Sequence, residues 1–143
     1  MHSTEYHVRI AGYGVITDGD RILLAWYNGE QGKADPGWSL PGGGIEFDEP
    51  LSAGVVREAL EETGYTVELG PLLAEDHLTW PARPDRAPIR AQRFLFAATI
   101  TGGELGTLEE EGTTDFARWV PMAALADQPL ADIVMLALRA LGR

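Results

Sequence analysis

Three glutamates and an arginine lie close together in the segment REALEETG, residues 57–64. On a helix, Glu58, Glu61 and Glu62 would fall within two turns, and no lysine is interspersed among them. Carboxylates at this spacing repel one another unless a cation neutralises them. Their oxygens suit hard divalent ions such as Mg²⁺ or Mn²⁺. The spacing therefore predicts a metal site, and a solvated acidic helix face is the alternative interpretation.

The segment around these glutamates has the signals of a helix from about residue 50 to residue 63. We expect Asp48 to cap its N-terminus, Pro50 to occupy the first turn and Gly64 to end it in a left-handed conformation. With about 100° between successive residues, the small and apolar residues share one face, opposite the glutamates. The predicted buried face consists of Ser52, Val56, Ala59, Leu60 and Thr63.

Three consecutive glycines, residues 42–44, precede this helix. Glycine has no Cβ, so its backbone can approach a ligand closely, and its carbonyl oxygens can complete a metal shell. An ordinary turn is the alternative interpretation. We favour a role in the site because these glycines directly precede the glutamate helix, so loop and helix can meet at the helix's N-terminal half.

The rest of the chain must position these groups. β-branched and aromatic residues predict strands over 6–16, 21–27, 38–40, 65–80, 89–101 and 116–120. Further helices are predicted over 121–126 and 130–141, and loops over 28–37 and 81–88. Strands on both sides of one central helix favour an α/β fold in which helices cover a mixed sheet.

The composition narrows the classes of function. The 143 residues are 45% hydrophobic, so we expect a single domain over residues 1–143. There is no cysteine, no apolar run of membrane-spanning length and no signal-peptide pattern, so we expect a cytoplasmic protein. The net charge of −11 argues against a nucleic-acid polymer as partner. A small phosphorylated ligand is compatible with that charge if a metal ion accompanies it.

The stretch GGIEFDEPLSAGVVREALEETGY, residues 43–65, resembles the signature of the Nudix hydrolases, the MutT-like family. That signature is a glycine, five residues, a glutamate, seven residues, Arg-Glu, two residues, Glu-Glu, one residue and a glycine. Every fixed position is filled here. Ala59 and Tyr65 are weaker matches at aliphatic positions, and Asp48 replaces a glycine that many members carry. The segments WSLPGGG and RWVPMAAL also look like the family.

This resemblance implies an α/β/α sandwich around a mixed β-sheet, with one central catalytic loop–helix–loop. It implies Mg²⁺- or Mn²⁺-dependent hydrolysis of a nucleoside diphosphate derivative, and a homodimer as the family-based guess. It also implies roles for individual residues: metal ligands or water activators at Glu58, Glu61 and Glu62, a ligand carbonyl at Gly42, an orienting arginine at Arg57, an outer partner at Glu49, and supporting glycines at Gly43 and Gly64.

Other candidates lie outside the signature. Family members often carry a further acid after the central strands, and Glu111 and Asp115 are the candidates here, with a solvated acidic loop as the alternative. Trp38 could stack on a base, and Arg90 and Arg93 could bind phosphate. A buried tryptophan and scattered surface arginines are the alternatives.

Two rival functions have the same fold. A catalytically inactive nucleotide-sensing module would bind nucleotide without hydrolysis, but such modules usually lose box glutamates and carry a DNA-binding region. An isomerase of isoprenoid diphosphates would need a catalytic cysteine, which this chain lacks. The signature handles only the diphosphate, so the sequence does not select a base or sugar.

Overall fold

The computed structural model describes residues 1–143, and the apolar stretches of the sequence form two β-sheets and three helices. The elements are β1 (His7–Val15), β2 (Thr17–Asp18), β3 (Arg21–Tyr27), β4 (Gly37–Ser39), β5 (Gly42–Gly44), α1 (Leu51–Thr63), β6 (Tyr65–Trp80), β7 (Ile89–Gly103), β8 (Thr114–Pro121), the 3₁₀ helix η1 (Met122–Asp127) and α2 (Asp132–Ala140).

The larger sheet has the strand order β5-β1-β7-β6 and is mixed, because β1 pairs with β7 in parallel while the other neighbours are antiparallel. A smaller antiparallel sheet has the order β2-β3-β4, and β8 pairs with the other edge of β3. The predicted mixed sheet is therefore confirmed. The glycine triplet, which the sequence suggested as a loop, forms the short edge strand β5.

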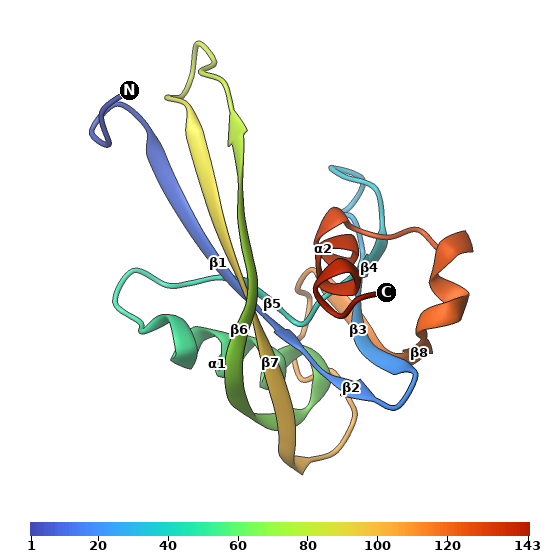
Figure 1. Cartoon of the computed structure of the whole chain (residues 1–143). Coiled ribbons are helices and arrows are strands. Elements are labelled where there is room, and N and C mark those ends of the chain that lie inside the picture. Colours follow the sequence, from blue (N-terminus) through green and yellow to red (C-terminus); the bar gives the residue numbers. More distant parts are fainter.

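Alternate residues of β3 face the two helices. Leu23 belongs to an apolar cluster that includes Ala59 of α1. Ile22 and Leu24 belong to a second cluster that includes Val134 of α2. Successive side chains of a strand point to opposite faces, so α1 and α2 cover opposite sides of the strands (Figure 1). The predicted α/β/α sandwich is confirmed.

Helix α1 agrees with the prediction in its bounds and, at Ala59 and Thr63, in its buried face, but its cap differs and Ser52 and Leu60 are exposed. It begins at Leu51, with Pro50 as N-cap and no capping side chain, so the prediction of Asp48 as the cap was wrong. Gly64 has φ 80°, which confirms the left-handed stop. Leu60 is 37% exposed, whereas Glu62 is only 6% exposed. The buried residues are Gly54, Val55, Ala59, Glu62 and Thr63.

The C-terminal part closes the second core cluster. Residues 122–127 form a 3₁₀ helix, and α2 spans a shorter range than the predicted 130–141. None of the helices has both the length and the apolar character that crossing a lipid bilayer requires.

Candidate active site

The edge strand β5 brings the glycine triplet against α1. The N–H of Gly42 donates to Oε2 of Glu62 over 2.7 Å. Gly42 has φ 147°, and a Cβ there would lie 2.6 Å from Cα of Tyr13 on β1. A Cβ at Gly43 would lie 3.5 Å from Oε1 of Glu58. The missing Cβ of Gly42 therefore allows the β5 backbone to lie close against β1, whereas a Cβ on Gly43 would lie at ordinary van der Waals distance from Glu58 of α1.

Glu62 is buried beneath the site. Its Oε1 accepts a hydrogen bond of 3.1 Å from the hydroxyl of Thr114 on β8, which complements the bond from Gly42. Burial raises the pKa of Glu62 well above its usual range, and the two hydrogen bonds oppose that shift only in part. Helix periodicity placed Glu62 opposite the predicted buried face, and the hydrogen bonds from Gly42 and Thr114 explain why the fold accommodates its carboxylate inside.

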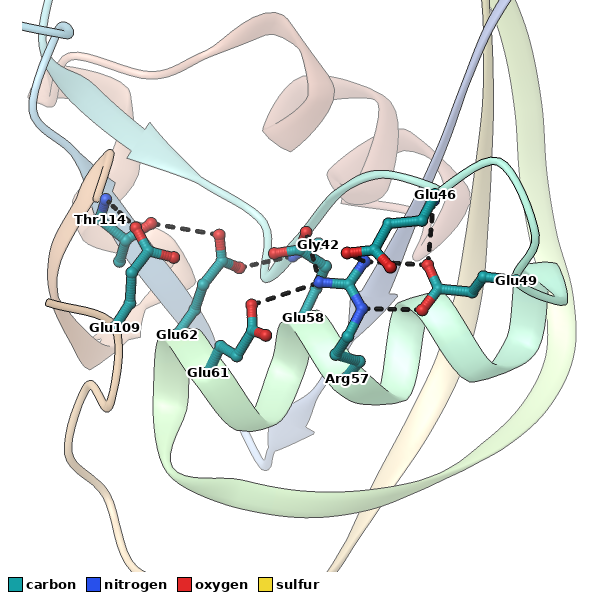
Figure 2. Close-up of polar contacts among 9 residues, drawn as sticks. All are labelled: Gly42, Glu46, Glu49, Arg57, Glu58, Glu61, Glu62, Glu109 and Thr114. Atoms are coloured by element: carbon teal, nitrogen blue, oxygen red, sulfur yellow. Dashed lines mark hydrogen bonds and ion pairs between the residues drawn. The ribbon is translucent and has the colours of Figure 1, made fainter. Parts of the chain in front are cut away.

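Arg57 connects the glutamates of the helix to the preceding loop (Figure 2). Its Nε and Nη2 donate to the two oxygens of Glu49 over 2.7 and 2.9 Å. Its Nη1 donates to Glu58 over 3.2 Å and to Glu61 over 3.3 Å. The bidentate bond from Arg57, helped by the backbone N–H of Glu46, lowers the pKa of Glu49 to about 2. The guanidinium thus fixes carboxylates from two parts of the signature.

A third acid joins Glu58 and Glu61 from outside the helix. Carboxylate oxygens of Glu58, Glu61 and Glu109 lie within 4.8 Å of one another. Burial raises the pKa of Glu58, and although the charge of Arg57 lowers it, the charge of Glu61 raises it further. Three oxygen donors with surplus negative charge fit a hard divalent cation by their chemistry.

The structure places Glu109, rather than Glu111 or Asp115, beside the glutamates of the helix. The backbone N–H of Glu109 donates to the carbonyl of Glu61 over 3.0 Å, which brings the loop across the end of α1. Glu111 is exposed, and Asp115 accepts a hydrogen bond from Asn28 instead. Glu109 and the candidate Glu111 belong to one run of three glutamates, residues 109–111, and nothing in the sequence distinguishes the members of this run.

Trp38 lies in the core. It is 6% exposed, packs edge-to-face on Trp26 with ring centroids 5.1 Å apart, and its Nε1 donates to Gln128 over 3.0 Å. The alternative interpretation of a buried tryptophan therefore describes Trp38, and the idea of an open stacking surface there was wrong.

The two candidate arginines have different surroundings. Arg93 is buried and paired with Asp76 and Asp132, so its guanidinium is not a free surface cation. Arg90 donates to Gln92 over 3.0 Å near the end of the β6–β7 hairpin. Neither arginine hydrogen-bonds to the glutamate cluster.

The family model of the NUDIX domain matches residues 5–138, and the chain belongs to the Nudix family. The chain is 43% identical over 68 residues to a MutT-like protein of Streptomyces ambofaciens, covering 47% of this chain and 40% of that protein. It is 31% identical over 111 residues to an ADP-ribose pyrophosphatase of Methanocaldococcus jannaschii, covering 77% of this chain and 62% of that protein. The chain thus spans about half the length of these curated relatives.

Solved structures agree with this assignment. The crystal structure of a MutT NUDIX hydrolase from Burkholderia pseudomallei superposes with a TM-score of 0.69 at 26% identity, covering 94% of this chain and 98% of that chain. The sequence resemblance to the Nudix family is therefore confirmed.

Proposed function

We propose that this chain is a metal-dependent pyrophosphohydrolase that cleaves a diphosphate linkage in a nucleoside diphosphate derivative. The observation that carries the proposal is the convergence of carboxylate oxygens from Glu58, Glu61 and Glu109 within 4.8 Å of one another. The first two belong to α1 within the Nudix signature, and Glu109 belongs to the loop between β7 and β8. The alternative interpretation, a solvated acidic helix face, does not explain why Glu109 of a distant loop lies beside Glu58 and Glu61.

Glu58, Glu61 and Glu109 would hold Mg²⁺ or Mn²⁺. When bound, such an ion neutralises the charge of the diphosphate and lowers the pKa of a water molecule that can attack phosphorus. Glu62 and the carbonyl of Gly42 stay predicted ligands. What favours Glu62 is that its carboxylate is held beside the cluster by two hydrogen bonds.

The remaining residues of the site orient the carboxylates. Glu49 fixes the guanidinium of Arg57 with two bonds, and Arg57 then holds Glu58 and Glu61 on the same side of α1. Held in this way, a carboxylate can accept a proton from water without first losing rotamer freedom. In the proposed function, Arg57 and Glu49 therefore orient the carboxylates, and the cluster of Glu58, Glu61 and Glu109 would hold the metal ion and accept protons.

The test is a product-analysed screen of purified protein with Mg²⁺ or Mn²⁺ against ADP-ribose, deoxynucleoside triphosphates, dinucleoside polyphosphates and nucleotide sugars. ADP-ribose heads the panel because one relative bears the name ADP-ribose pyrophosphatase. We expect hydrolysis of at least one compound, abolished by EDTA and restored by metal. Tight nucleotide binding without turnover of any compound would contradict the proposal and favour the sensing module.

The cytoplasmic location, the single domain over 1–143 and the homodimer stay predictions of the sequence. Sedimentation equilibrium of the purified chain would test the homodimer directly.

A further inference from the structure

The loop that carries Glu109 is anchored on one side to the end of α1. The backbone N–H groups of Leu108 and Glu109 both donate to the carbonyl of Glu61, over 2.8 and 3.0 Å. The hydroxyl of Thr107 donates to the carbonyl of Glu62 over 2.7 Å. These bonds satisfy carbonyls that a helix end leaves without partners. These hydrogen bonds fix the backbone of the loop against the C-terminal end of α1, but they do not fix the side chain of Glu109.

The other side of the same loop is held by Asn28, directly after β3. Its Nδ2 donates to the carbonyl of Gly112 over 2.9 Å and to Oδ1 of Asp115 over 3.0 Å. Its backbone N–H donates to the carbonyl of Thr113, and its Oδ1 accepts from the N–H of Glu30, both over 2.9 Å. One asparagine thus joins two segments more than eighty residues apart in the sequence.

The side chain of Glu109 rests on the part of the loop that Asn28 holds. A Cβ built on Gly112 would overlap the carboxylate, Cδ and Cγ of Glu109. The N–H of Thr114 donates to Oε1 of Glu109 over 3.2 Å. The carboxylate therefore reaches Glu58 and Glu61 by crossing a backbone segment that has no side chain at Gly112 and is tied in place at Asn28.

We infer that Asn28 and Gly112 are positioning residues for Glu109: Asn28 fixes the 112–115 backbone, and the missing Cβ of Gly112 leaves the space through which Glu109 reaches the metal cluster. The inference rests on the proposed function, because it takes Glu109 as a metal-binding carboxylate. If Asn28 had a purely structural role, its mutation would change the stability of the fold. The effect of that mutation on Mn²⁺ affinity would then not depend on whether Glu109 is present.

Mn²⁺ affinity, measured by the electron paramagnetic resonance signal of free Mn²⁺, separates these cases. Removing an outer partner of a metal ligand typically costs 10- to 100-fold in affinity. We expect Asn28→Ala to weaken Mn²⁺ binding by about tenfold in wild type and to have no further effect in a Glu109→Gln background. Gln31→Ala, an exposed amide of the adjacent loop, is the matched control and should leave affinity unchanged.

Gly112→Ala leaves the side chain of Asn28 unaltered, and its new Cβ meets the side chain of Glu109 first, so it tests the inference even if Asn28→Ala folds poorly. It should weaken Mn²⁺ binding as much as Glu109→Gln does. Unchanged affinity in Gly112→Ala, or an equal loss from Asn28→Ala in both backgrounds, would overturn the inference alone. A wild-type protein that binds no Mn²⁺ would overturn the proposed function and the inference with it.

Discussion

Two arginines organise carboxylates in this molecule, and their surroundings differ in charge balance. Arg93 of β7 is 9% exposed and pairs with Asp76 of β6 and Asp132 of α2, each over 2.8 Å. Arg57 of α1 is 28% exposed and lies within ion-pair distance of four carboxylates. These are Glu46, Glu49, Glu58 and Glu61.

The two networks differ in whether the arginine compensates the carboxylates around it. Hydrogen bonds from Arg93 lower the pKa of Asp76, as expected for a carboxylate whose partner compensates it. Around Arg57 the pKa of Glu49 falls to about 2, because Arg57 donates two hydrogen bonds to it. The pKa of Glu58 rises instead, because burial and the charges of Glu61 and Glu109 outweigh the effect of Arg57. The Arg93 network therefore joins the sheet to α2, whereas the Arg57 network leaves surplus negative charge, which under the proposed function a divalent cation would neutralise.

The largest expected effect is on activity, at Arg57. Lysine has one nitrogen in place of the planar fork and cannot make the four bonds of Arg57 to Glu49, Glu58 and Glu61. We expect Arg57→Lys to lower kcat on the order of 10²-fold, equivalent to about 3 kcal/mol of transition-state stabilisation. Thermal denaturation should show little change. A near-wild-type kcat would mean that Arg57 does not orient the cluster.

The same comparison predicts a loss of stability, rather than of metal binding, at Arg93. Arg93→Met leaves Asp76 and Asp132 without their partner, and we expect the free energy of unfolding to fall by about 2 kcal/mol, because the exposure of Asp132 moderates the cost of a broken buried pair. Urea denaturation measures this, with Arg90→Met as the control. Normal stability combined with weakened Mn²⁺ binding would reverse the roles assigned to the two arginines.

The smallest effect concerns pH. The pKa of Asp76 is lowered in the folded chain, so its contribution to stability is present above the unfolded value of about 3.9 and is lost as pH falls through the folded value. Between pH 5 and pH 2, roughly the window in which an aspartate titrates, the stability of wild type should fall more steeply than that of Asp76→Asn, by about 1 kcal/mol at most. Parallel curves would show that Arg93 does not stabilise the charged form.

Local signals in the sequence were sufficient to predict the bounds of helix α1 and its left-handed end, but not the tertiary pairing of side chains. The bounds of α1 and the left-handed Gly64 follow from periodicity and from the conformational freedom of glycine. The partners of Arg93 lie 17 and 39 residues away, so the sequence could not show that this arginine is paired rather than free. Sequence periodicity shows which residues share a face of one helix or strand, but it does not show contacts that depend on how helices and strands pack together.

Glu62 and Glu109 show the same limit inside the site. A glutamate is expected on an exposed face, yet Glu62 is buried because Gly42 and Thr114 supply donors from other elements. Glu109 reaches the cluster through a loop path that requires Gly112 beneath its side chain. Loop geometry of this kind has no periodicity, so the sequence could not show that Glu109, rather than Glu111 or Asp115, lies beside Glu58 and Glu61.

The most direct test of the central claim is the stabilisation of the fold by metal. At about a hundredfold excess over Kd, a divalent ion should raise the free energy of unfolding of wild type by about 2.7 kcal/mol. Glu58→Gln removes a carboxylate of the cluster, whereas Glu46→Gln removes one that lies 3.9 Å from Arg57, is 70% exposed and does not belong to the cluster.

Thermal melts of the three proteins with and without Mn²⁺ therefore separate a metal site from a general acidic surface. A metal site at the cluster predicts that Glu58→Gln loses most of the Mn²⁺-induced shift in Tm and, without metal, is at least as stable as wild type because repulsion is relieved. It predicts that Glu46→Gln keeps the full shift. Equal Mn²⁺-induced shifts in all three proteins would contradict it.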